Sequence, residues 1–179
     1  MKPRMNTENT EVYKKIRENG AGFYQPKRGL IAVWGKEAVQ FLNGLITNDV
    51  AKLEDDGAPL LAAFPNAQGR LLAVVRVLKT GDRFLFETEA ATREKVFQNL
   101  FRFTFAGDFF VEDLSEKYEY FSMQNAKCKM QNPAALEFET KFGADCFVPV
   151  AAAEDFRNEL LQQNAIEISE TLYEVLRIE

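Results

Sequence analysis

The 179-residue sequence contains no histidine. This absence excludes histidine-based catalytic triads, the usual histidine-containing zinc sites and the commonest general base near neutral pH. Cysteine is also scarce, because only Cys128 and Cys146 are present, and their spacing matches no metal-binding motif. Two thiols do not make the disulfide scaffold of a small secreted domain, so we expect a reduced, cytoplasmic protein.

Long apolar runs and excess positive charge are missing as well. No stretch approaches the roughly 18 consecutive apolar residues of a membrane helix, and the polar N-terminus lacks the apolar segment of a secretory signal. Lys and Arg number 22 against 27 Asp and Glu, a net charge of −5. Nucleic-acid binding by bulk electrostatics needs a basic face, so we expect neither a nucleic-acid nor a membrane partner.

The residues that are present predict a folded α+β protein. Hydrophobic residues make up 46% of the chain and charged residues 27%, and no linker or internal repeat divides it. The periodicity predicts antiparallel sheets with flanking helices. Helices are expected at 8–19, 36–45, 90–103, 151–163 and 170–177, and strands at 29–35, 58–64, 71–78, 83–88, 109–114, 118–124, 136–140 and 146–150.

Several polar groups admit both a ligand-binding and a structural interpretation. Thr47-Asn48-Asp49 could present polar groups to a ligand or could fasten a helix end through its own side chains. The turn from Asn66 to Arg70 could hold a carboxylate or phosphate through its arginine, or Arg70 could simply be exposed. Arg28 and Arg177 could each bind an anionic ligand or form ordinary ion pairs.

For the acidic run and the two cysteines, the sequence gives less support to a functional interpretation. The acidic run Glu54-Asp55-Asp56 lacks the alternating spacing of a cation-binding loop, so we expect a solvated turn and no metal site. Cys128 lies between two lysines, which would lower the pKa of its thiol, but an idle loop cysteine has the same surroundings. Cys146 lies in an apolar strand and is expected in the core.

The order of several motifs resembles a known family. Between Arg28 and Glu179 the chain carries them in the order Arg28–Gly35, Leu45–Val50, Asn66–Leu71, Phe84–Thr88, Ala90–Arg93, Phe110–Ser115 and Leu176–Glu179. This order is similar to that of the folate-binding superfamily of the glycine cleavage T-protein (aminomethyltransferase) and its YgfZ-type relatives. The resemblance implies a fold like the first two interleaved domains of that superfamily, without its C-terminal barrel. It implies one domain at 1–50 with 115–179 and a second, incomplete one at 51–114.

Departures from the family pattern favour one branch of it. T-proteins carry paired aspartates after the glycine-rich turn, where this chain has Ala73 and Val74. Their glutamate-rich loop corresponds to 142–146, where only Asp145 is acidic. An apolar side chain supplies neither charge nor a proton acceptor, so we expect no catalytic residue for aminomethyl transfer. YgfZ-type proteins also lack these acids, and their hallmark Lys-Gly-Cys loop would follow Glu179, so we expect a truncated chain.

Three interpretations follow from the resemblance. The first is a tetrahydrofolate-binding, YgfZ-like accessory protein linked to iron–sulfur cluster maintenance and tRNA modification, with iron–sulfur proteins as partners. The second is a divergent aminomethyltransferase, and the third is a folded, non-catalytic remnant that self-associates as a homodimer. By position in the family, the folate-binding residues are expected to be Arg28, Asp49, Arg70, Glu89 and Arg177.

Overall fold

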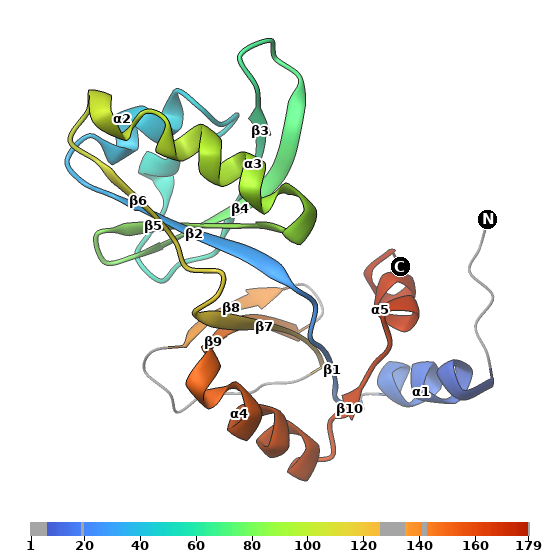
Figure 1. Ribbon diagram of the computed structural model, residues 1–179. Coiled ribbons are helices and arrows are strands. Elements are labelled where there is room, and N and C mark those ends of the chain that lie inside the picture. The colour runs from blue at the N-terminus through green and yellow to red at the C-terminus, as the bar shows by residue number, and fades with distance from the viewer. Residues whose placement is uncertain (1–6, 19, 126–134, 141–142, 179) are drawn as a thin grey trace. The chain divides into compact units, whose positions relative to one another are not determined.

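The computed structural model describes residues 7–18, 20–125, 135–140 and 143–178. The chain divides into two compact units, one formed by 1–26 with 119–179 and the other by 27–118. The first unit is therefore discontinuous in sequence, and the second is inserted into it (Figure 1).

The second unit is built on a five-stranded antiparallel sheet with the strand order β3-β4-β5-β2-β6. Its strands are β2 (Arg28–Trp34), β3 (Leu60–Pro65), β4 (Leu71–Thr80), β5 (Arg83–Glu89) and β6 (Phe110–Asp113). One face of the sheet is covered by the helices α2 (Ala38–Asn43) and α3 (Ala90–Phe101) (Figure 1). Two 3-10 turns, η1 (Val50–Lys52) and η2 (Thr104–Ala106), complete the unit.

Alternation along the strands divides this sheet into two different faces. Val75, Val77 and Phe86 point into the core beneath α2 and α3, where Leu42 and Leu100 meet them. Successive side chains of a strand point to opposite faces, so the intervening residues of β4 and β5 lie on the other face. That second face carries charged residues and forms the candidate site described below.

The first unit contains a sheet with the strand order β10-β1-β7-β9-β8. The strands are β1 (Gly22–Tyr24), β7 (Tyr118–Gln124), β8 (Leu136–Thr140), β9 (Gly143–Pro149) and β10 (Ile166–Glu167). Phe121, Phe156 and Leu160 join the sheet to α4 (Val150–Gln162). A separate apolar cluster that includes Ile16 and Leu172 packs α1 (Thr7–Arg17) against α5 (Glu170–Ile178).

The α+β class with antiparallel sheets and flanking helices is confirmed by this architecture. The helix expected over 36–45 is shorter, because its last turn closes at Gly44, where the Gly44 N–H donates to the Phe41 carbonyl at 3.1 Å and the Leu45 N–H donates to the Leu42 carbonyl at 2.9 Å. The strands β1 and β10 were not predicted, since three and two residues are too few to show alternation. Cys128 lies outside the described residues, and Cys146 is fully buried as expected.

The boundaries of the compact units differ from the domain boundaries expected from the resemblance. The chain passes from one unit to the other between Pro26 and Lys27 and again between Tyr118 and Glu119, whereas the expected boundaries lay near 50 and 114. The reason is the position of β2, which pairs with β5 along its whole length and with β6 on its other edge. Residues 28–34 are thus at the interior of the second sheet.

A charged network joins α3 to the end of β6. Arg93 Nε donates to Asp113 Oδ2 at 2.8 Å, and the Ser115 hydroxyl and N–H donate to Asp113 Oδ1 at 2.6 and 2.9 Å. Desolvation, the largest single effect, raises the pKa of Asp113, but the hydrogen bonds from Ser115 and Arg93 together lower it below its ordinary value. The folded protein therefore favours the ionised carboxylate.

We predict that Gly35→Ala strongly destabilises the protein. Gly35 has φ +124°, and a Cβ there would lie 2.5 Å from the Asp108 carbonyl oxygen and 2.6 Å from the Phe109 Cα. The strained backbone and the clash together should lower the free energy of unfolding by about 2–4 kcal/mol in urea titrations. Gly69→Ala is the matched control, because its φ is +75° but nothing lies within 4 Å; it should cost about 1 kcal/mol. Equal losses would contradict the role of the Gly35 contact.

We predict that the contribution of Asp113 to stability disappears in acid. Its folded pKa is lowered, so the stabilisation is complete above the ordinary pKa of about 3.9 and is lost as pH falls through the folded value. Asp113→Asn should reduce the free energy of unfolding by about 1–3 kcal/mol at pH 7, and the difference from the unmodified protein should narrow below about pH 4.

The control for this titration is Glu116→Gln. Glu116 also accepts from Arg93, but its side chain is 83% exposed, so the substitution should change stability by less than about 0.5 kcal/mol. A difference between Asp113→Asn and the unmodified protein that stays constant down to about pH 2 would contradict the lowered pKa.

Candidate functional site

A buried carboxylate lies at the centre of the second sheet, on the face opposite α2 and α3. Glu87, on β5, is 1% exposed and contacts arginines from both neighbouring strands. Arg76 of β4 is its direct register partner, and its Nε donates to Glu87 Oε2 at 2.5 Å. Arg28 of β2 donates from Nε and Nη2 to Glu87 Oε1. We call the surface around these three residues the Glu87 face.

The charges of this cluster are partly accessible. The Arg28 and Arg76 side chains are 25% and 22% exposed, whereas the carboxylate between them is sealed. A buried carboxylate is tolerated when charge-assisted hydrogen bonds satisfy its oxygens, as two guanidinium groups do here. Both oxygens of the Glu87 carboxylate are thus occupied by hydrogen bonds from the two arginines.

An apolar strip borders the arginines on the same face. Val74 of β4 lies two residues before Arg76 and is 52% exposed, while Leu61 of β3 is the register partner of Arg76 and is 63% exposed. Ala63, opposite Val74, completes the strip. Exposed aliphatic side chains beside guanidinium groups are suited to a ligand with a flat apolar part and an anionic part.

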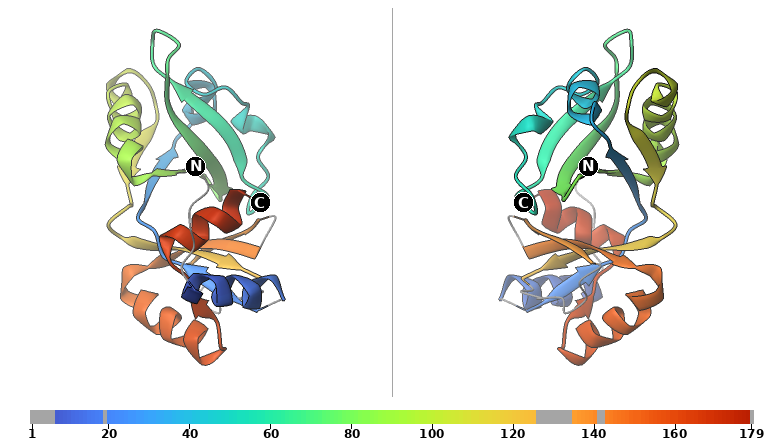
Figure 2. Two further views of the ribbon diagram at one scale, coloured as in Figure 1. Left: turned by 90° about the vertical axis from the view of Figure 1, so that its right-hand side faces the viewer. Right: turned by 90° about the vertical axis from the view of Figure 1, so that its left-hand side faces the viewer.

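The structure brings together two of the five residues expected to bind folate. Arg28, the first residue of β2, is the register partner of Glu89, the last residue of β5, and the exposed Glu89 is also the N-cap residue directly before α3. Arg70 is exposed at the turn before β4, and this turn extends beyond the neighbouring strands (Figure 2). Arg177 belongs to the other unit, on α5, where its Nη2 donates to Glu174 at 2.6 Å.

Asp49 has a structural role in the turn after α2. Its Oδ1 accepts from the Ala51 N–H at 3.0 Å and from the Asn43 amide at 2.7 Å. Both hydrogen bonds lower the pKa of Asp49, and the bond from the Ala51 backbone has the larger effect on this pKa. Asp49 therefore caps η1 as an ionised carboxylate.

Thr47 and Asn48 fasten the edge strand β3. The Thr47 hydroxyl accepts from the Ala63 N–H at 2.9 Å, and the Thr47 N–H donates to the Ala63 carbonyl at 3.1 Å. Asn48 Nδ2 donates to the Leu61 carbonyl at 3.2 Å. These bonds support the structural interpretation of the Thr-Asn-Asp motif, because they occupy backbone groups that an edge strand would otherwise expose.

The other turn motifs are also accounted for by internal hydrogen bonds. Asn66 Oδ1 accepts from the backbone N–H of Gln68 and of Arg70 at 3.0 and 2.9 Å, which shapes the turn before β4. Asp55 Oδ1 accepts from the Gly81 N–H at 2.5 Å, and Asp56 Oδ1 accepts from the Thr80 hydroxyl at 3.2 Å. The acidic run therefore fastens one loop to the β4–β5 hairpin.

No group of three or more Asp, Glu, Cys or His side chains is placed to hold a metal ion in the described part of the chain. Among these residues, no helix is long and apolar enough to cross a membrane.

Arg76 and Glu87 were not predicted from the sequence as site residues. Arg76 is a charged side chain within the mostly apolar strand Leu71–Thr80, and Glu87 follows the apolar run Phe84–Phe86 in the strand Arg83–Glu89. That signal is detectable in the sequence, but the pairing of the two residues depends on the register between β4 and β5.

Known proteins resemble this chain in sequence or in fold. No protein-family model matches the chain. Over 88 residues it is 35% identical to the "Iron-sulfur cluster assembly factor IBA57 homolog, mitochondrial" of Pyricularia oryzae, a match that covers 46% of this chain and 22% of that protein. The heterotetrameric sarcosine oxidase of Corynebacterium sp. U-96 has a TM-score of 0.45 at 9% identity, with 84% of this chain and 89% of that chain covered.

A stronger structural match is with the glycine cleavage system aminomethyltransferase T from Bartonella henselae. The TM-score is 0.76 at 19% identity, and the match covers 90% of this chain and 52% of that chain. The chain thus spans about half the length of that aminomethyltransferase. This match confirms that the chain has the fold of a glycine cleavage aminomethyltransferase T, as the motif order led us to expect.

Proposed function

We propose that this chain is a tetrahydrofolate-binding accessory protein of iron–sulfur cluster assembly and does not transfer aminomethyl groups. The observation that carries the proposal is Val74, which is exposed on the Glu87 face at a position where the family resemblance implies a catalytic aspartate. The fold of an aminomethyltransferase is thus combined with an apolar residue at the point where that chemistry needs a carboxylate.

The Glu87 face has the chemical groups that a folate requires. The flat face of a pterin ring packs against apolar side chains, so the strip of Leu61, Ala63 and Val74 offers it a wall. The glutamate tail of folate is anionic, and the partly exposed guanidinium groups of Arg28 and Arg76 lie next to that strip. Glu89 and Arg70 are further candidates at the borders of this face, while the roles proposed for Asp49 and Arg177 depend on the resemblance alone.

The link to iron–sulfur clusters rests on the similarity to the IBA57 homolog, an iron-sulfur cluster assembly factor by its name. We propose that iron–sulfur proteins are the partners of this chain, and that tRNA modification is affected through the enzymes that carry such clusters. Aminomethyl transfer is the alternative function, and it is favoured by the structural match to aminomethyltransferase T.

We predict that tetrahydrofolate binds to the protein and that Leu61→Asp weakens this binding at least about tenfold, a loss of about 1.4 kcal/mol. A carboxylate in the apolar strip would have to be desolvated against the ring and would repel the anionic tail. Anaerobic calorimetric titration of the purified chain with tetrahydrofolate measures both affinities. Leu61→Ile keeps the strip apolar and should bind like the unmodified protein.

A matched control lies on a different surface. Leu161 of α4 is 41% exposed, so Leu161→Asp places the same charge on an exposed apolar position of the other unit. It should leave the affinity for tetrahydrofolate unchanged. No binding by the unmodified, folded chain, or equal losses for the two aspartate variants, would contradict the proposed site.

A second measurement separates the accessory function from aminomethyl transfer. In cells that lack the gene, we predict reduced activity of a [4Fe–4S] enzyme such as aconitase, with no change in a cluster-free dehydrogenase. Leu61→Ile should restore that activity and Leu61→Asp should not. Release of ammonia from an aminomethyl-loaded carrier protein by the purified chain, with normal cluster enzymes in the deleted cells, would instead establish the transferase.

A further inference from the structure

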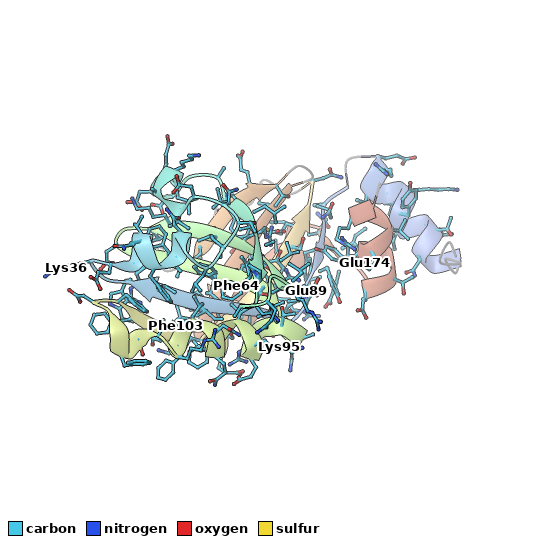
Figure 3. The ribbon with its side chains drawn as sticks, turned by 90° about the horizontal axis from the view of Figure 1, so that it is seen from above. Lys36, Phe64, Glu89, Lys95, Phe103 and Glu174 are labelled. Atoms are coloured by element: carbon cyan, nitrogen blue, oxygen red, sulfur yellow. The ribbon has the colours of Figure 1, made fainter. Side chains whose placement is uncertain are left out.

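A cavity lies in the 27–118 unit, away from the Glu87 face. Its volume is about 460 Å³, within the range of small-molecule sites, and it is formed between α2 and the segment that follows α3. Its aromatic residues Phe41, Phe103 and Phe109 belong to the apolar core on the helix-covered side of the sheet. In Figure 3, Phe103 and Lys36 lie toward one end of this unit and Glu89 toward the other.

The walls of the cavity are aromatic. The rings of Phe41 and Phe109 stack with centroids 3.8 Å apart, and Phe103 meets Phe41 edge to face at 6.0 Å. The face of an aromatic ring carries partial negative charge and attracts cations. This attraction already operates here, because the Arg102 guanidinium lies 4.6 Å from the centre of the Phe103 ring.

One carboxylate stands among the residues that line the cavity. Glu37 Oε2 accepts from the Asp108 N–H at 2.7 Å, and the Glu37 N–H donates to the Asp108 carbonyl at 3.1 Å. No lysine or arginine of the described residues forms a salt bridge with Glu37; the nearby Lys36 pairs with Asp108 at 3.7 Å. Backbone hydrogen bonding therefore fixes the carboxylate at the cavity, and among the described residues no salt bridge compensates its charge.

Gly107 makes this arrangement possible. A Cβ at this position would lie 2.7 Å from Glu37 Oε2 and 2.8 Å from the Phe109 ring. Any larger residue would displace either the carboxylate or the ring. The absence of a side chain thus keeps the acidic and aromatic groups together at one cavity.

From these contacts we infer that the cavity binds an organic cation, an ammonium or guanidinium group carried on an apolar body. The aromatic walls receive the body and attract the charge, and Glu37 pairs with the cationic group. Such a cation can be a free small molecule or a lysine or arginine side chain of another protein. This inference is independent of the proposed folate site, because it uses other residues on the opposite side of the sheet.

The test compares a cation with its neutral analogue. Phenethylammonium and 2-phenylethanol have similar bodies but differ in charge, so the cation should bind at least about tenfold more tightly at about 0.15 M ionic strength. Binding is followed by ¹H–¹⁵N spectra of the folded chain, and the amides of Gly44 and Gly107, which line the cavity, should shift.

Substitutions test whether the Glu37 carboxylate is responsible for the preference for the cation. Glu37→Gln retains an oxygen that can accept from the Asp108 N–H but removes the charge, so the affinity for phenethylammonium should fall about tenfold while that for phenylethanol stays the same. Glu54→Gln, an acidic position of the same unit outside the cavity, should change neither affinity. Gly107→Ala should weaken binding by displacing Glu37.

Several outcomes would overturn the inference. They are equal affinities for the cation and the alcohol, no effect of Glu37→Gln, shifts at residues away from the cavity, or no binding of either probe up to about 10 mM. Capped lysine and arginine amides distinguish the two sources of the cation. Binding comparable to that of phenethylammonium assigns the site to a side chain of another protein, and much weaker binding assigns it to a free small molecule.

Discussion

The Arg28–Glu87–Arg76 cluster constrains the second unit more than any other interaction. It joins three adjacent strands through one carboxylate that is almost completely buried. Removing such a group from water costs several kcal/mol, and the cost is offset only when its charged partners are correctly placed. The register of β4, β5 and β2 must therefore be kept, since a slip by one residue would point Glu87 into the apolar core.

The same cluster limits the chemistry of the face on which it lies. Both oxygens of the Glu87 carboxylate accept hydrogen bonds from guanidinium groups. The adjacent Val74 offers no acid or base, and Leu61 extends the apolar surface. The face thus combines paired charges with an aliphatic strip, and the proposed ligand binding depends on these two features.

Most of the fold could be predicted from the sequence because its strands and helices carry clear periodicities. In β5, Phe84 and Phe86 alternate with residues of the other face, and the helices α3 and α4 repeat apolar residues at helical spacing. The site was less predictable. Arg28 and Glu89 were expected as ligand-binding residues, but the central Glu87 was not. Its role depends on contacts with two arginines that are 59 and 11 positions away in the sequence. Such contacts depend on strand order, which local patterns do not encode.

The motifs that carried the family resemblance have mainly structural roles. Thr47 and Asn48 protect the edge of β3, Asp49 caps η1, and Asn66 shapes the turn that leads into β4. Any chain that adopts this sheet needs equivalent hydrogen bonds, whatever reaction it serves. A shared fold at 19% identity is therefore expected from these residues and says little about chemistry. The activity must therefore depend on other residues, whose positions these motifs help to fix. The most important of these are Val74 and the arginines beside it.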